Sequence, residues 1–209
     1  MTFYQKPLIL ASHSPRRKEL LSRAGINFDI FPASEDAEMP IPQNFDGPKN
    51  FFSPENFVKM QAQRKAESVM RQMPDRDCLI LGCDTVAVCE DVILGKPVDR
   101  QDAKKILQKL SGKIHYVITG ICLKNPHDPN FEKLEAVKTQ LFMENLTEEM
   151  LEDYLNSGAW KGKAGAFGYQ DKNNWLRIIS GSESNVVGLP MERLLEWLAD
   201  FSFPRTPFF

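Results

Sequence analysis

A short segment at residues 12–17, Ser-His-Ser-Pro-Arg-Arg, places two arginines at the expected start of a helix. The helix pattern has Ser14 as N-cap and a proline at the first position, directly after an apolar run at residues 8–11 that is typical of a buried strand. A helix N-terminus already carries partial positive charge, so Arg16 and Arg17 are unfavourable there unless an anion binds. We therefore predict a phosphate site at this turn; the alternative is a pair of solvated surface charges.

Asp84 interrupts an otherwise apolar segment, residues 79–89, that is typical of a strand buried on both faces. Burying a carboxylate is costly unless a cation or a metal pairs with it. We interpret Asp84 as a metal ligand or general base, against the alternative of an aspartate that caps a backbone turn. Glu35, Asp36 and Glu38 would alone be a solvated charge run. Together with Asp84 they offer the oxygen ligands that Mg²⁺ takes alongside substrate phosphates.

Two glycine-bearing segments add further chemistry, Gly-Lys-Pro at residues 95–97 and Lys-Ala-Gly-Ala-Phe-Gly-Tyr-Gln at residues 163–170. Neither matches a P-loop or a dinucleotide-binding fingerprint, which disfavours an ATPase or a nicotinamide enzyme. The small residues of the second segment permit close approach of a flat ligand, and Gln170 can donate and accept hydrogen bonds on a base edge. His115, within an expected strand, is interpreted as structural.

Strand-like and helix-like segments alternate along the chain, which predicts an α/β fold with a mixed sheet. Without a repeat or a long linker, we expect a single domain over residues 1–209, with a long proline-rich loop at residues 34–53. The expected strands are residues 8–11, 27–32, 79–89, 92–94, 114–124, 135–143 and 175–179. The expected helices are residues 15–24, 54–70, 99–112, 147–156 and 190–201.

The bulk properties of the 209 residues limit the partners that we expect. A net charge of −2 provides no global field for nucleic acid, so an anionic ligand must be recognised by local basic residues. The four cysteines lack the Cys-x-x-Cys spacing of zinc or redox sites and are interpreted as core residues in a reducing compartment. Because no signal-peptide pattern and no apolar run of about 20 residues is found, we expect a cytoplasmic protein without membrane contact.

Taken in order along the chain, the motifs resemble those of the Maf family of nucleoside triphosphate pyrophosphatases. The resemblance covers nearly the whole chain, about residues 8–200, and rests on the segments at residues 12–21, 82–86, 95–97, 110–112, 115–120, 163–170 and 186–190. It implies a mixed α/β fold with flanking helices and two lobes around a central cleft, of the Maf/ITPase-like type. It also implies hydrolysis of a nucleoside triphosphate to the monophosphate and pyrophosphate, as a house-cleaning activity, with Mg²⁺ or Mn²⁺ as cofactor and with homodimers common.

The resemblance also implies roles for single residues. The expected catalytic residues are Asp84, Glu38 and Lys65, with Asp84 and Glu38 holding the metal. The expected substrate-binding residues are Ser12, Arg16, Arg17, Thr85, Lys96, Lys163 and Gln170. The family glutamate aligns with Glu38 only through a one-residue insertion, so Glu35 stays open as the alternative.

The substrate expectation rests on Phe167 and Gln170, which resemble the branch of the family that favours dTTP and UTP. Asp171 stands where the family usually has glycine, and Tyr169 where it usually has an aliphatic residue. One alternative is the same chemistry on modified purines, namely 7-methyl-GTP or inosine and xanthosine triphosphates. The alternative from another class is a nucleotide-sensing regulator of cell division without turnover, against which the strand carboxylate Asp84 argues.

Overall fold

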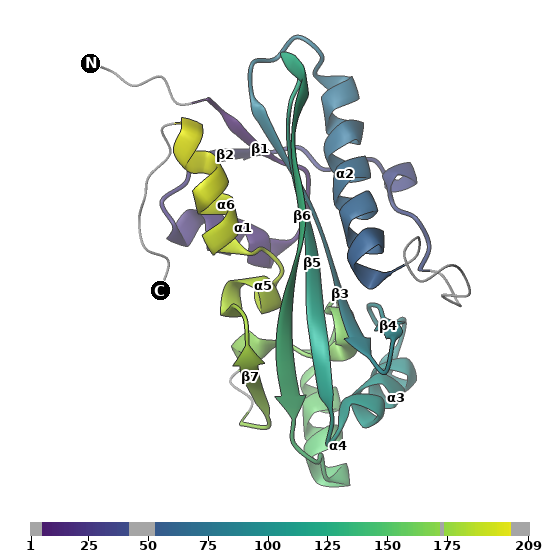
Figure 1. The fold of residues 1–209 in the computed structure, drawn as a ribbon. Coiled ribbons are helices and arrows are strands. Elements are labelled where there is room, and N and C mark those ends of the chain that lie inside the picture. Colours follow the sequence, from purple (N-terminus) through teal and green to yellow (C-terminus); the bar gives the residue numbers. More distant parts are fainter. Residues whose placement is uncertain (1–5, 42–52, 172–173, 202–209) are drawn as a thin grey trace.

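A seven-stranded mixed sheet forms the centre of the computed structural model, which describes residues 6–41, 53–171 and 174–201 (Figure 1). The strand order is β2-β1-β3-β5-β6-β7, with β4 paired to β3. The strands are β1 (Leu8–Leu10), β2 (Phe28–Ile30), β3 (Leu79–Cys89), β4 (Val92–Leu94), β5 (Ile114–Asn125), β6 (Asp128–Met143) and β7 (Leu176–Ser180). The helices are α1 (Pro15–Arg23), α2 (Pro54–Gln72), α3 (Arg100–Leu110), α4 (Glu148–Ser157), α5 (Glu183–Val187) and α6 (Met191–Leu198). The 3₁₀ turns are η1 (Glu35–Ala37), η2 (Ala164–Ala166), η3 (Tyr169–Asp171) and η4 (Ala199–Phe201).

The sheet combines a parallel and an antiparallel part. Strand β1 pairs parallel with both β2 and β3, and the connections through α1 and α2 provide the crossovers that parallel pairs require. The remaining neighbours are antiparallel, and β3 and β5 pair over nine consecutive positions from Ile80↔Lys124 to Val88↔Tyr116. The predicted α/β class with a mixed sheet is confirmed.

The upper half of the molecule in Figure 1 is a three-layer arrangement. Helices α1 and α6 share one apolar cluster with β1, β3 and β5, while α2 covers the opposite face of the sheet. Two glycines let α2 lie directly on the strands: a Cβ at Gly82 would be 2.1 Å from the Ala62 carbonyl oxygen, and one at Gly120 would be 2.0 Å from that of Val58. This close contact fixes the height of α2 above β3, and with it the reach of any α2 side chain toward Asp84.

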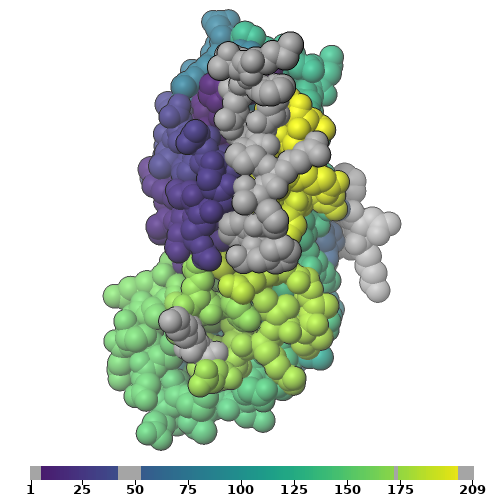
Figure 2. Space-filling view, turned by 90° about the vertical axis from the view of Figure 1, so that its left-hand side faces the viewer, coloured from purple at the N-terminus to yellow at the C-terminus, as the bar shows by residue number. Residues whose placement is uncertain are grey.

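The lower half has its own apolar cluster, formed by α3, α4, β7 and the segment around residues 160–169. In Figure 2 the green residues of this half lie below the purple N-terminal residues and the yellow α6. Strands β3, β5 and β6 run through both halves and connect them (Figure 1). The architecture thus provides two halves on one continuous sheet.

Some boundaries differ from the expected ones, and each difference has a local cause. Strand β6 begins at Asp128 rather than near residue 135, because its first three residues are exposed and the apolar residues Phe131 and Leu134 that follow do not alternate with a period of two. Helix α5 was not predicted; it has only five residues, and an apolar stripe cannot be recognised over so short a length. The last helix was expected over residues 190–201; α6 ends at Leu198, and the 3₁₀ turn η4 follows it.

Other expectations concern single segments. The long loop at residues 34–53 contains η1, and residues 42–52 of this loop lie outside the described residues. Ser14 occupies the N-cap position of α1, but its side chain makes no capping hydrogen bond. All four cysteines are buried and free, as predicted for core residues. No helix among the described residues is long and apolar enough to cross a membrane.

Candidate active site

A pocket of about 720 Å³ lies between the two halves and collects every predicted site residue. Its upper wall comes from the β1–α1 turn and from the segment after β2, its floor from β3, β5 and α5, and its lower wall from residues 161–170. The predicted residues on its lining are Ser12, Arg16, Arg17, Glu38, Lys65, Asp84, Thr85, Lys96, Lys163 and Gln170. Residues separated by up to 158 positions in the sequence therefore face one space.

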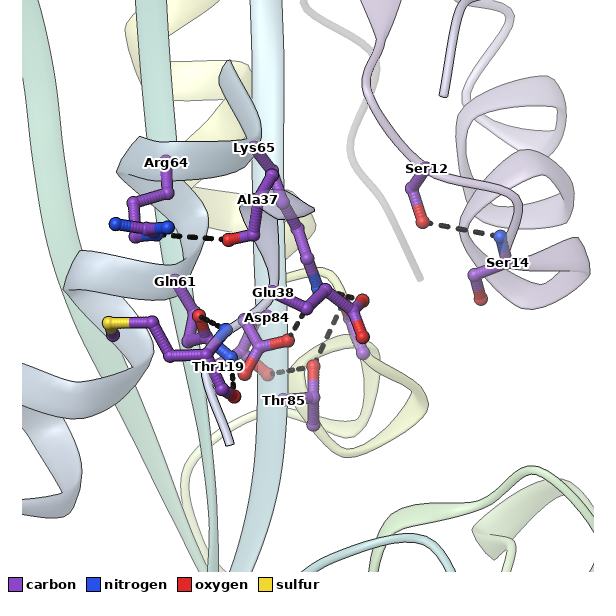
Figure 3. Close-up of polar contacts among 12 residues, drawn as sticks. Ser12, Ser14, Ala37, Glu38, Gln61, Arg64, Lys65, Asp84, Thr85 and Thr119 are labelled. Atoms are coloured by element: carbon purple, nitrogen blue, oxygen red, sulfur yellow. Dashed lines mark hydrogen bonds and ion pairs between the residues drawn. The ribbon is translucent and has the colours of Figure 1, made fainter. Parts of the chain in front are cut away.

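At the centre of the pocket, one lysine joins two carboxylates. Lys65 Nζ lies 2.7 Å from Asp84 Oδ1 and 2.8 Å from Glu38 Oε1 (Figure 3). Lys65 comes from α2, Asp84 from β3 and Glu38 from the residue after η1. The Lys65 side chain is only 9% exposed, so its ammonium needs these two partners. The hydrogen bond from Lys65 lowers the pKa of the Glu38 carboxyl, and desolvation of that carboxyl opposes the shift.

Helix α2 also holds the segment that carries Glu38. The Gln61 side chain accepts a hydrogen bond from the Met39 backbone N–H and donates one to the Met39 carbonyl, at 2.8 and 3.0 Å. Arg64 donates to the carbonyl of Ala37 at 3.1 Å (Figure 3). Glu38 is thus fixed to the same helix as Lys65, whereas Glu35 lines the pocket without an ion pair to Lys65 among the described residues.

The two carboxylates fit a divalent cation that completes its shell with substrate oxygens. Within the described residues, Asp84 Oδ2 and Glu38 Oε2 have no hydrogen-bond partner, and both residues face the pocket. Mg²⁺ is commonly bound by one or two carboxylates together with water and substrate phosphates. The described residues contain no group of three or more His, Cys, Asp or Glu side chains that could hold a metal alone. The donor set therefore fits a metal that arrives with a phosphate ligand.

Arg17 is 8% exposed and is held by hydrogen bonds from three sides. Its Nε donates to the Gly188 carbonyl at 2.8 Å, Nη1 to Ser12 Oγ at 2.9 Å, and Nη2 to Thr85 Oγ1 at 3.1 Å. Thr85 is also hydrogen-bonded to Thr119 at 3.0 Å. Arg17 therefore connects the β1–α1 turn to β3 and to the C-cap of α5, and its position is fixed before any ligand binds.

Arg16 has a different environment. Its Nη2 donates to the carbonyl of Gly162 at 3.1 Å, which links the upper wall of the pocket to the lower wall. Burial, followed by repulsion from Arg17, lowers the pKa of the Arg16 guanidinium, while the charge of Asp171 raises it. Arg16 remains cationic, since the ordinary pKa of an arginine lies far above neutral pH. Of the two arginines at the helix start, Arg17 is therefore fixed within the upper wall, and Arg16 connects the upper wall to the lower wall.

The lower wall is a turn-rich segment packed on a histidine. Phe167 is buried and stands edge-to-face against His115, with ring centroids 5.2 Å apart. Burial lowers the pKa of His115 to about 4, so its imidazole is neutral at pH 7, as expected for a structural residue. The Gly165 N–H donates to the Gly95 carbonyl at 3.0 Å and brings Lys96 to the pocket. Gln170 is exposed at the rim.

Several lining or supporting residues were not predicted. Val186 and Gly188 lie in a motif that the sequence displayed, but that motif was given no role. Lys161 lies two positions before Lys163 and lines the same wall. Asp171 accepts a hydrogen bond from Lys163 Nζ at 2.5 Å, and its Oδ2 accepts another from the Tyr154 hydroxyl at 2.6 Å. No periodicity links α4 to residue 171, so this contact had no sequence signal.

The chain matches the family model described as "Maf-like protein" over residues 7–201. It is 49% identical over 195 residues to a dTTP/UTP pyrophosphatase of Rhodopirellula baltica, covering 93% of this chain and 82% of the relative. It is 40% identical over 189 residues to a dTTP/UTP pyrophosphatase of a Geobacillus species, covering 90% of this chain and 94% of the relative.

Among solved structures, a HAM1 protein from Coxiella burnetii matches with a TM-score of 0.48 and 14% identity, covering 93% of this chain and 99% of that chain. A nucleoside-triphosphatase, dITP/XTP pyrophosphatase, from Mycobacterium abscessus matches with a TM-score of 0.42 and 12% identity, covering 91% and 92%. At these scores the resemblance supports no conclusion about the reaction or the substrate.

Proposed function

The chain belongs to the Maf-like protein family, and on this premise we propose that it hydrolyses dTTP or UTP to the nucleoside monophosphate and pyrophosphate with the aid of a divalent metal. The observation that carries the proposal is the contact of Lys65 with both Asp84 and Glu38 inside a pocket lined by further cations. Carboxylates for a metal and cations for a polyphosphate meet in one space, as this hydrolysis requires.

Asp84 is the proposed general base. Its Oδ1 accepts a hydrogen bond from Lys65, Oδ2 has no partner among the described residues, and the residue lines the pocket. A water that attacks the α-phosphorus transfers a proton to this carboxylate as the new P–O bond forms. The bond between the α-phosphorus and the bridging oxygen breaks, and pyrophosphate leaves with that electron pair. A Mg²⁺ or Mn²⁺ ion bound by Asp84 and Glu38 would supply positive charge at the phosphate oxygens.

Lys65 has two tasks in this arrangement. Its ammonium holds Asp84 and Glu38 in place, because it bonds to one oxygen of each. It also supplies a nearly desolvated positive charge beside the phosphates, where electrostatic stabilisation is stronger than in water. Arg16 and Lys96 add positive charge on the upper and lower sides of the pocket and are suited to stabilise the pyrophosphate leaving group.

The nucleoside half is assigned to the lower wall. Phe167 on this wall and Val117 and Val186 on the adjoining floor supply apolar surface, and Gln170 supplies an amide at the rim. An amide can pair with a carbonyl and an imino N–H, which uracil and thymine both present. The curated relatives named above as dTTP/UTP pyrophosphatases support this choice of base.

Product analysis tests the proposed reaction. The purified chain is incubated with Mg²⁺ or Mn²⁺ and, in turn, dTTP, UTP, CTP, ATP, inosine triphosphate and 7-methyl-GTP, and the products are separated by chromatography. We expect monophosphate and pyrophosphate from dTTP and UTP. A diphosphate with orthophosphate would contradict cleavage at the α-phosphorus, and turnover of purines alone would contradict the base assignment. Binding of nucleotides without any turnover would favour the nucleotide-sensing regulator.

A further inference from the structure

Asp171 lies directly behind the lower wall of the pocket. Both of its carboxylate oxygens accept hydrogen bonds from Lys163 Nζ, each at 2.5 Å, and Oδ2 also accepts one from the Tyr154 hydroxyl at 2.6 Å. Lys163 lines the pocket, whereas Asp171 does not. Asp171 therefore acts on the ligand space through Lys163.

This contact is shielded from solvent. The side chains of Lys163 and Asp171 are 14% and 19% exposed. Tyr154 is 8% exposed and packs edge-to-face on Trp175, which belongs to the apolar cluster of the lower half. Charge-assisted hydrogen bonds in such surroundings hold their partners in one geometry, and removing one partner leaves the other charge uncompensated. The ion pair thus anchors the pocket wall to the core.

The ion pair also closes residues 163–171 into a compact turn. A Cβ at Gly168 would lie 2.4 Å from Lys163 Nζ and 2.6 Å from Asp171 Oδ2, so the two side chains rest on the backbone of this glycine. Phe167 and Gln170 lie on either side of Gly168 within the same turn, and both line the pocket. Their placement depends on whether this turn stays closed.

The pairing divides the cations of the pocket into two kinds. Lys163 has a carboxylate at hydrogen-bond distance, which cancels most of its charge at the distance of a bound polyphosphate. Arg16 donates only to the neutral carbonyl of Gly162 among the described residues, and it keeps its full charge. Attraction for phosphate therefore comes from Arg16 and the other lining cations more than from the ion-paired Lys163.

We propose that Asp171 is a positioning residue for the nucleoside half of the substrate: through Lys163 and Tyr154 it fixes the turn at residues 163–171 and so sets how well the base fits. Removing this carboxylate would not weaken binding of the phosphate half, because Asp171 only offsets positive charge on Lys163 and Arg16. The proposal rests on the proposed function, because it requires a nucleotide in this pocket. It goes further in assigning Asp171, which lies outside the pocket lining, to selectivity between bases.

Two half-ligands separate these contributions without any turnover. Titration calorimetry with Mg²⁺ present measures the affinity of UMP and, separately, of inorganic pyrophosphate for the unmodified chain and for Asp171→Ala, Asp171→Asn and Tyr154→Phe. We expect Asp171→Ala to weaken UMP binding about tenfold, the usual effect of losing a charge-assisted hydrogen bond, and to leave pyrophosphate binding unweakened. Tyr154→Phe removes one of the contacts and should have a smaller effect in the same direction. Asp171→Asn retains an acceptor and should recover part of the UMP affinity.

Glu90→Gln is the matched control, because Glu90 pairs with Lys113 at 2.9 Å at the exposed surface and lies outside the pocket lining. It should leave both affinities unchanged. Equal weakening of UMP and pyrophosphate in Asp171→Ala would show a merely structural role and would overturn the proposal, as would unchanged affinity for both. Failure of the proposed function is recognised separately, since it would appear in the unmodified chain as absence of UMP binding or of nucleotide hydrolysis.

Discussion

The two walls of the pocket are built in different ways. The carboxylate–lysine centre is carried by a long helix and a long strand, with α2 in direct backbone contact with β3 and β5 through Gly82 and Gly120. The lower wall is carried by 3₁₀ turns that are closed by a side-chain ion pair, Lys163 with Asp171. The proposed catalytic residues Lys65 and Asp84 lie on a rigid helix and strand. The wall assigned to the base lies in residues 163–171, whose shape depends on a few side-chain contacts. Changes in the first region should therefore affect turnover, and changes in the second should affect selectivity.

Among the variants that compare the carboxylate–lysine centre with the lower wall, Lys65→Met should cause the largest loss of kcat. It removes the ammonium that lies 2.7 Å from Asp84 and 2.8 Å from Glu38, and the two carboxylates then repel each other. We expect kcat for UTP to fall by about 100-fold or more, the usual effect of losing one electrostatic donor at an active site. Steady-state kinetics measures this, with Lys59→Met on the same helix as a control outside the pocket lining. A Lys65→Met variant with unchanged kcat would remove this lysine from the centre.

Gly120→Ala tests the rigid mounting of α2. The added Cβ would lie 2.0 Å from the Val58 carbonyl oxygen, so helix and strand must separate. We expect the free energy of unfolding to fall by about 3 kcal/mol, as for other overpacked cores, with a loss of kcat because Lys65 moves with α2. Urea unfolding and kinetics measure the two effects. Unchanged stability and unchanged kcat together would contradict the view that backbone contact positions the centre.

His115 makes the lower wall sensitive to acid. Because its pKa falls from an ordinary 6.5 to about 4 in the folded chain, the unfolded chain binds more protons between these values, and stability decreases as the pH falls through this window. We expect a loss of about 2 kcal/mol between about pH 7 and about pH 5. Carboxyl groups such as Glu38, whose pKa is lowered from 4.5, lose their contribution only at lower pH. Urea unfolding at both pH values should show this slope in the unmodified chain, and an equal slope in His115→Leu would contradict the assignment.

Gln170→Ala should produce the smallest effect and should leave kcat nearly unchanged. The side chain is exposed at the rim and has no hydrogen-bond partner within the described part of the chain, so its removal disturbs no contact of the fold. We expect the preference for UTP over CTP, measured as the ratio of kcat/KM values, to fall by about tenfold or less. A drop in kcat that is equal for both nucleotides would contradict the separation of the two walls.

The carboxylate–lysine centre was more predictable from the sequence than the lower wall of the pocket. The β1–α1 turn and the buried strand around Asp84 have strong local signals, namely a proline at the helix start and an apolar run interrupted by one carboxylate. The structure places all the predicted site residues on one pocket, although their roles in catalysis and binding remain predictions. The contact of Lys65 with both carboxylates depends on how α2 lies on the sheet, and the sequence contains no measure of that distance.

The lower wall was less predictable. The ion pair between Lys163 and Asp171 joins two residues eight positions apart in a segment without helical or strand periodicity. The sequence showed Asp171 only as a departure from the family pattern, without a partner. The first half of β6 was missed for a related reason, because its two apolar residues, Phe131 and Leu134, lie three positions apart and contact different clusters, so no period-2 alternation marks the strand. Contacts set by tertiary packing leave little trace in local residue patterns.

The most direct test of the central claim is the turnover of UTP and dTTP by Asp84→Asn, compared with the unmodified chain and with Asp36→Asn. Asp36 lies on η1, beside the same segment, but outside the pocket lining, and it provides the same chemical change as a control. We predict that Asp84→Asn loses about 1,000-fold or more in kcat, since it removes both the base and a metal ligand, while its thermal unfolding shows a folded protein. Asp36→Asn should retain full activity. An Asp84→Asn variant that is folded and fully active would contradict the assignment of this carboxylate to catalysis.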